Sequence, residues 1–176
     1  MTNAKFYLED LRTKFQKINP NEYYLSYSGG KDSHLLYWFI KTYAPEFSGI
    51  KVVGINTYLE HQEIRERIYN NSDIVLQPKL KPFEIKEKYG IPCFSKGQDD
   101  FIDRYQCGLR SESVINRLYS RNRDGSKSMF GVSKKARELL LAGKLHRVSP
   151  KCCFFLKKQP AKEFEKQSGL KPILRC

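Results

Sequence analysis

The sequence of 176 residues lacks any hydrophobic run that could cross a membrane. A membrane-spanning helix needs roughly 18 to 20 consecutive apolar residues. The first residues are also unlike a secretory signal, because Asn3, Lys5, Glu9 and Asp10 stand where such a signal is apolar. We therefore expect no membrane partner and a cytoplasmic location.

Cysteine is scarce and its number is odd, with five residues of which Cys152 and Cys153 are adjacent. Disulfide-held secreted domains usually have an even number of spaced cysteines. The pattern therefore favours reduced thiols or metal ligands. The sequence also lacks repeats and low-complexity tracts, and 40% of its residues are hydrophobic. We expect one folded domain over residues 1–176.

Acidic residues are too few to balance the basic ones, so the net charge is +13. This surplus suits an anionic partner and leaves open whether that partner is a nucleotide, a nucleic acid or an acidic protein. Many of the basic residues lie between Arg104 and Arg147, together with Tyr105, Tyr119 and Phe130. This stretch is either a nucleic-acid-binding surface with aromatic contacts or a solvated charged face.

Apolar patterns typical of helices alternate with patterns typical of strands. In chain order they predict helix 5–18, strand 23–27, buried helix 33–40, strand 49–56, helix 60–69, strand 73–76 and helix 81–89. This alternation predicts a Rossmann-like α/β fold, in which helices flank a parallel sheet and ligands bind at the carboxyl ends of its strands. No fourth strand is evident. Beyond Gly97 the pattern is mainly helical and basic, with an exposed loop at residues 125–128.

One loop carries the clearest chemical signal. It is Ser28-Gly29-Gly30-Lys31-Asp32-Ser33, between the first predicted strand and the following helix. Two glycines let backbone N–H groups approach a phosphate, and the start of a helix favours negative charge. Lys31 supplies a cation, and Asp32 can cap the helix or position Mg²⁺. The alternative is a glycine-rich turn without a ligand.

The loop differs from two common phosphate-binding motifs. A Walker A loop has Ser or Thr after its Lys, whereas Asp32 follows Lys31 here. The dinucleotide motif G-x-G-x-x-G is also absent. What the loop resembles is the PP-loop ATP pyrophosphatase superfamily, and within it the phosphoadenosine phosphosulfate (PAPS) reductase-like family. The matching segments are 26–33, 56–60 and, more loosely, 107–113 and 151–160.

The resemblance implies an adenine nucleotide alpha hydrolase-like fold and a set of site residues. Nucleotide-binding residues would be Ser26, Ser28, Gly29, Gly30, Lys31, Asp32, Ser33, Asn56, Thr57 and Glu60, with Lys31 and Asp32 also catalytic. The intact loop is similar to that of members that cleave ATP, with Mg²⁺, between the α- and β-phosphates to adenylate an acceptor. The alternatives are a PAPS or APS reductase and a non-catalytic nucleotide-binding protein.

The family also implies a division of the chain and further partners. The segments would be an N-terminal helix (1–22), a nucleotide-binding core (23–95), a basic helical segment (96–149) and a Cys-Cys helix with a shortened tail (150–176). Cys152 and Cys153 match a pair that holds a [4Fe-4S] cluster in some sulfonucleotide reductases, or else they start a helix with one thiol buried. A reductase would use Cys176 as its nucleophile. Homodimers are common among such proteins, and relatives that modify tRNA or DNA imply one of these nucleic acids as a partner of the basic region 104–147.

Overall fold

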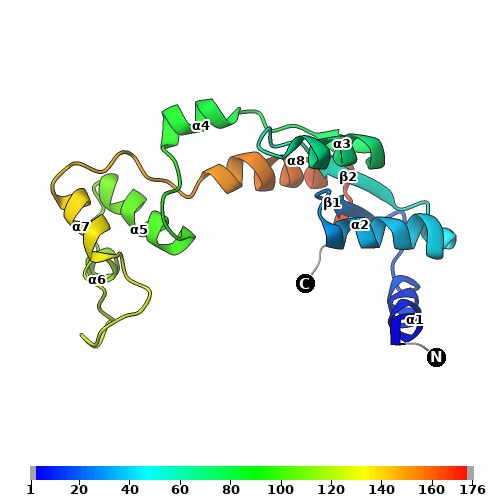
Figure 1. Cartoon of the computed structure of the whole chain (residues 1–176), viewed down its shortest axis with the longest axis horizontal. Coiled ribbons are helices and arrows are strands. Elements are labelled where there is room, and N and C mark those ends of the chain that lie inside the picture. The colour runs from blue at the N-terminus through cyan, green and yellow to red at the C-terminus, as the bar shows by residue number, and fades with distance from the viewer. Residues whose placement is uncertain (1–2, 174–176) are drawn as a thin grey trace. The chain divides into compact units, whose positions relative to one another are not determined.

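The computed structural model describes residues 3–173, and Figure 1 shows their helices and strands. The α-helices are α1 (Asn3–Phe15), α2 (Lys31–Trp38), α3 (Gln62–Asn71), α4 (Pro82–Tyr89), α5 (Lys96–Gln106), α6 (Glu112–Leu118), α7 (Lys134–Leu141) and α8 (Gln159–Ser168). The strands are β1 (Tyr23–Tyr27), β2 (Lys51–Ile55), β3 (Ile74–Leu76) and β4 (Lys171–Ile173). Short helical segments are η1 (Phe39–Tyr43), η2 (Pro45–Phe47) and η3 (Phe154–Lys158).

The chain divides into two compact units. Unit 1 consists of Met1–Lys79 and Lys157–Cys176, and unit 2 of Leu80–Leu156. Unit 2 is therefore an insertion in the sequence of unit 1, between β3 and α8. We expected one domain from the chain length. The division into two compact units does not test that expectation, which stays a prediction.

Unit 1 is built on a parallel sheet with the strand order β3-β2-β1-β4. Leu25 of β1 lies opposite Val52 of β2 on one side and Ile173 of β4 on the other. The prediction of a Rossmann-like parallel sheet is confirmed. Strand β4 was not expected from the sequence, because it has only three residues and includes Pro172. Proline removes a backbone donor, so it is tolerated on such an edge strand.

Side chains of β1 alternate between two layers of helices, as the twofold period of a strand requires. Leu25 and Tyr27 belong to a buried cluster that includes Phe15, Phe39 and Ile68. Tyr24 lies on the other face, where its ring meets Phe164 of α8 edge-on, with 5.2 Å between centroids. The sheet is therefore covered by α8 on one face and by α1, η1 and α3 on the other.

The helix after β1 is less buried than its apolar sequence predicts. None of the residues of α2 is fully buried, and Leu35 is 54% exposed. Full burial starts only at Phe39 and Ile40, in η1. The prediction of a buried helix at residues 33–40 is therefore wrong for its first part, because α2 starts at the edge of the sheet and its continuation supplies the core.

Unit 2 contains α4, α5, α6 and α7 around a smaller core. Its buried cluster is Ile102, Leu118, Val132, Ala136, Leu140 and Val148. Residues 125–127 are exposed as expected, but Ser128 is only 4% exposed, so the predicted exposed loop is one residue shorter. Across residues 3–173, no helix has both the length and the apolarity needed to span a membrane.

Candidate nucleotide site

The loop Ser28–Ser33 joins the carboxyl end of β1 to the first turn of α2. Gly29 has a φ of 72°, a conformation that side chains other than glycine rarely adopt. A Cβ at this position would also lie 2.9 Å from Cγ2 of Ile64 in α3. Glycine is thus required twice, by the backbone and by the neighbouring helix.

The N-terminus of α2 has no side-chain cap. Gly30 is the N-cap and contributes no side-chain hydrogen bond. The Ser33 hydroxyl donates to the Gly30 carbonyl at 3.0 Å and lies 3.2 Å from the Ser28 hydroxyl. Ser33 therefore shapes the loop, and the first turn of α2 has the arrangement in which helices generally bind phosphate.

The two residues expected to act in catalysis lie on this turn. The side chains of Lys31 and Asp32 are both exposed, in the first turn of α2. An exposed ammonium can reach an anion without paying the full cost of burial. Their position at the end of β1 agrees with the phosphate-binding role that we expect, which stays a prediction.

The segment after β2 is held in place by its own side chains. Asn56 and Thr57 are buried, and Glu60 accepts hydrogen bonds from the Thr57 N–H at 3.0 Å and from the Thr57 hydroxyl. Asn56 Nδ2 donates to the Tyr69 hydroxyl at 3.0 Å, and Asn56 Oδ1 accepts from the Tyr58 N–H at 2.9 Å. Asn56 thus has a structural role, while Glu60 fixes the backbone of Thr57.

A cavity of about 640 Å³ lies at this edge of the sheet, within unit 1. Its walls are formed by Tyr24, Ser26, Tyr27, Ser28, Ile55, Thr57, Glu60, Lys157, Lys158, Ala161, Lys162, Glu165 and Pro172. Four of the predicted binding residues, Ser26, Ser28, Thr57 and Glu60, are brought together in it. The other six, Gly29, Gly30, Lys31, Asp32, Ser33 and Asn56, are not among the residues that line it.

Sequence reasoning missed the wall contributed by the C-terminal helix. Lys157, Lys158 and Lys162 bring three cations to the cavity, and Lys158 and Lys162 are four residues apart on one helical face. This spacing was the signal in the sequence that could have indicated a basic helical face. The sequence alone could not show that this face lies near the nucleotide loop, since unit 2 separates it from the first three strands along the chain.

A tyrosine and a carboxylate pair in the same wall. The Tyr24 hydroxyl donates to Glu165 Oε1 at 3.2 Å. Burial raises the pKa of Tyr24 above its ordinary value, and the charge of Glu165 and its hydrogen bond add to the rise. Tyr24 is therefore a neutral donor here. Glu165 keeps acceptor capacity toward the cavity, since a carboxylate has about four lone-pair sites.

The cysteines provide little support for a metal site. Cys152 is half-buried and Cys153 exposed, so they begin a helical segment without the full burial of one thiol that we considered. Cys93 Sγ lies 3.1 Å from His146 Nε2, and Cys107 Sγ accepts from Arg147 at 3.0 Å. In residues 3–173, no three His, Cys, Asp or Glu side chains are arranged to hold a metal ion. The described residues alone do not supply a cluster's ligands, and Cys176 lies outside them.

No protein-family model, curated protein or solved structure matches the chain in the three comparisons with known proteins. The resemblance to the PAPS reductase-like family accordingly stays a prediction.

Proposed function

We propose that unit 1 binds an adenine nucleotide at the carboxyl edge of its sheet. The observation that supports this most strongly is that one cavity joins the end of β1, the segment after β2 and the lysines of η3 and α8. In open parallel sheets, ligands bind where neighbouring connections leave in opposite directions. Here β1 has β2 on one side and β4 on the other, so the cavity lies beside that position.

The size and lining of the cavity suit a nucleotide. Pockets for small ligands usually enclose about 300 to 1,000 Å³, and this one is within that range at about 640 Å³. Tyr24, Ile55 and Pro172 offer apolar surface for a base, whereas Lys157, Lys158 and Lys162 offer charge for phosphates. Glu165 would accept hydrogen bonds from ribose hydroxyls, as acidic residues do in other nucleotide sites.

We further propose that the chain cleaves ATP between its α- and β-phosphates and transfers the adenylyl group to an acceptor. Support comes from the intact loop Ser28–Ser33 and from the cations that surround the cavity. Lys31 and the cavity lysines Lys158 and Lys162 would stabilise negative charge that develops on the departing pyrophosphate. The protein's contribution is thus positional and electrostatic, and we assign no general base.

Mg²⁺ fits this proposal as a companion of the nucleotide. In nucleotide sites Mg²⁺ is usually held by phosphate oxygens and one or two carboxylates, so a preformed group of three protein ligands is not required. Asp32 and Glu60 are the carboxylates that would hold it, since they follow β1 and β2. When bound, the ion would neutralise phosphate charge.

Calorimetric titration with ATP, AMP and PAPS, with and without Mg²⁺, tests the proposal. We expect ATP with Mg²⁺ to bind most tightly, with pyrophosphate released when an acceptor is present. Preference for PAPS without pyrophosphate would instead favour a sulfonucleotide reductase that acts through Cys176. Binding without turnover would favour a nucleotide-binding protein without catalysis, and no binding of any nucleotide would refute the site.

A further inference from the structure

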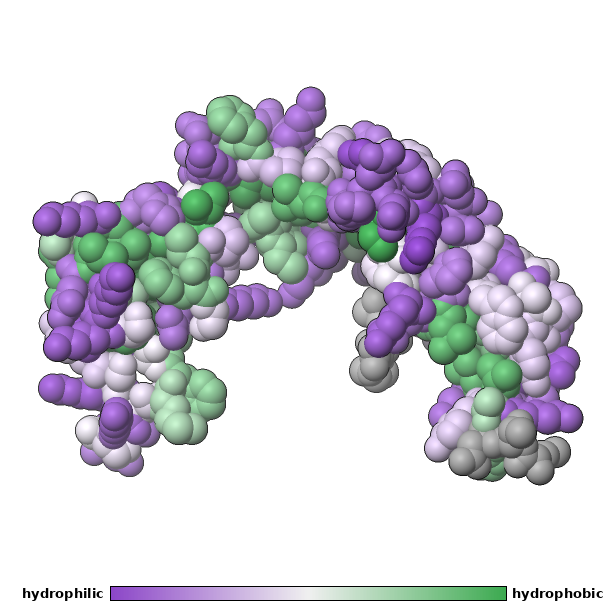
Figure 2. Space-filling model, viewed as in Figure 1, coloured by the Kyte–Doolittle hydropathy of each residue, from purple (hydrophilic) through white to green (hydrophobic). Residues whose placement is uncertain are grey.

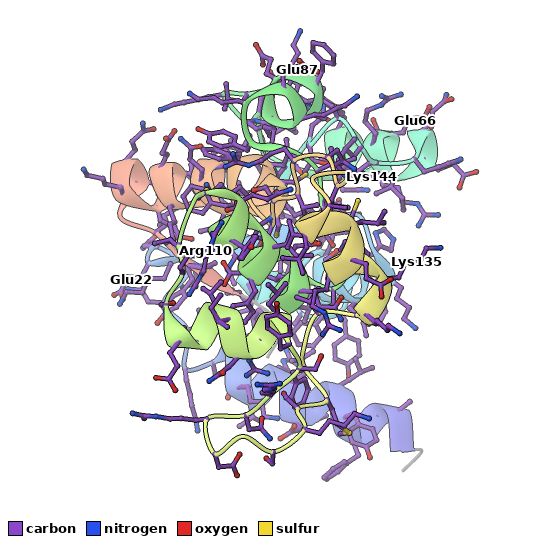
Figure 3. All side chains as sticks on the ribbon, turned by 90° about the vertical axis from the view of Figure 1, so that its left-hand side faces the viewer. Glu22, Glu66, Glu87, Arg110, Lys135 and Lys144 are labelled. Atoms are coloured by element: carbon purple, nitrogen blue, oxygen red, sulfur yellow. The ribbon has the colours of Figure 1, made fainter. Side chains whose placement is uncertain are left out.

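The basic residues of this protein are unevenly distributed along the chain. Residues 1–103 carry 14 Lys and Arg and 14 Asp and Glu, so they contribute no net charge. Residues 104–147, all in unit 2, carry 11 Lys and Arg against three Asp and Glu. Arg110, Lys135 and Lys144, labelled in Figure 3, belong to this set. Residues 104–147 therefore contribute eight of the 13 surplus positive charges.

The three acidic residues of this stretch are engaged locally. Asp124 accepts hydrogen bonds from the Ser126 N–H at 3.0 Å and the Ser126 hydroxyl at 2.7 Å, which hold the pKa of its carboxyl below the ordinary value. Glu138 lies 4.0 Å from Lys134, and Glu112 accepts from Asn116 at 3.5 Å. Most of the arginines therefore have no carboxylate partner among the pairs found in this stretch.

What the arginines contact instead is aromatic rings. Arg110 lies 3.6 Å from the centroid of the Tyr105 ring, and Arg117 lies between the rings of Phe101, at 5.6 Å, and Phe130, at 5.9 Å. Tyr119 has Arg121 at 5.9 Å and Arg137 at 5.1 Å. Figure 2 shows hydrophilic and hydrophobic side chains mixed over the part of unit 2 with α6 and α7.

The loop between α6 and α7 presents exposed apolar side chains from a hydrogen-bonded backbone. Phe130 is 74% exposed and Met129 91% exposed. The buried Ser128 hydroxyl accepts hydrogen bonds from Arg117 at 3.2 Å and from the Phe130 N–H at 3.3 Å. Earlier in the loop, Arg121 and Lys127 form an antiparallel bridge. Such pairing reduces the conformational freedom that the loop loses when a partner contacts the exposed ring.

A groove of about 350 Å³ with polar and charged lining residues is formed by α6 and the start of this loop. It is lined by Glu112, Ser113, Asn116, Arg117, Arg121, Asn122 and Arg123. Guanidinium groups bind phosphate oxygens in a two-pronged geometry, and Asn and Ser side chains add hydrogen bonds. The groove is thus suited to a phosphodiester backbone, with aromatic rings close by.

We propose that this face of unit 2, formed by α6, residues 120–132 and α7, binds single-stranded nucleic acid. Unpaired bases can stack on exposed rings such as Phe130 while their phosphates contact arginines. A duplex hides its base faces, and an acidic peptide has none, so either would leave the aromatic rings unused. This inference does not rest on nucleotide binding by unit 1.

Fluorescence anisotropy of the whole chain with labelled oligothymidine and oligouridine tests the proposal, with a duplex of equal length and polyglutamate as comparisons. We expect one or both single strands to bind more tightly than the duplex and to resist displacement by polyglutamate. Phe130→Ala should weaken binding at least about fivefold. The matched control is Phe6→Ala, which removes a 63% exposed ring from α1 and should change nothing.

The salt dependence separates phosphate contacts from stacking. Each phosphate contact to a single strand contributes about 0.7 to the slope of log affinity against log salt, so Arg121→Gln with Arg123→Gln should make the slope about 1.4 shallower. Lys5→Gln with Lys17→Gln removes the same charge from α1 and its following turn and should leave the slope unchanged. Lys31→Ala should also leave oligonucleotide affinity unchanged. Equal binding of duplex and single strands, or full affinity in Phe130→Ala, would overturn the proposal.

Discussion

The two units organise their candidate binding surfaces differently. Unit 1 contains all four strands of the described chain, and its cavity lies at the strand ends, where backbone pairing fixes the loops. Unit 2 has helices and only isolated bridges among the described residues, and its basic surface depends on side chains and one loop. A sheet positions backbone donors for a compact ligand. A helical surface instead presents cationic side chains and aromatic rings along an extended ligand.

The packing of the sheet in unit 1 can be disrupted at a single glycine. A Cβ at Gly54 in β2 would lie 2.6 Å from Cγ2 of Ile68 and 2.5 Å from Oγ of Ser72. We expect Gly54→Ala to reduce the free energy of unfolding by about 1 to 3 kcal/mol, measured by urea denaturation. Gly49→Ala is the control, because a Cβ there has no neighbour within 4 Å. Equal losses in both variants would contradict this account of the packing.

Lysines at the end of η3 and in α8 test where the phosphates bind. Replacing Lys158 and Lys162 with alanine removes two cations from the cavity, so affinity for ATP should fall by about tenfold or more, since a hydrogen bond to a charged group contributes about 1.5 to 3 kcal/mol. Affinity for AMP should fall less. Lys166→Ala on the same helix is the control, as Lys166 does not line the cavity. Similar losses in the control and the double variant would argue against the cavity.

In unit 2, Ser128 tests whether the loop between α6 and α7 contributes to oligonucleotide binding. Ser128→Ala removes a buried hydroxyl that accepts from Arg117 and the Phe130 N–H. We expect a loss of about 1 kcal/mol in the free energy of unfolding, because two partly buried donors lose their acceptor. Binding of oligothymidine should weaken as well, while ATP affinity stays constant. An equal effect on ATP affinity would show that the two units are not separate in function.

The smallest effect expected at neutral pH concerns Tyr24. Its pKa in the folded protein is raised, chiefly by burial, so its contribution to stability is complete below the ordinary tyrosine pKa of about 10. Stability should then fall as pH rises above 10 toward the folded pKa. Tyr24→Phe should make that fall less steep in urea denaturation at alkaline pH, and an unchanged fall would rule out this linkage. Tyr27 and Tyr43, whose pKa values are also raised, account for a remaining slope.

Much of unit 1 could be predicted from sequence because its signals are local. The apolar run of β1, the glycines after it and the helical pattern of α2 are adjacent along the chain. β4 could not be predicted, since three residues including Pro172 show no alternation and pair with β1 only through long-range contacts. Of the candidate site, the loop and the β2 segment were predictable, but the wall from α8 was not.

The central claim, that a nucleotide binds at the carboxyl edge of the sheet in unit 1, is tested most directly by amide hydrogen exchange with and without ATP and Mg²⁺. We predict slower exchange in peptides that cover residues 26–36, 56–62 and 155–166, with no change across residues 104–147. Protection confined to residues 104–147, or none anywhere at saturating ATP, would contradict the claim.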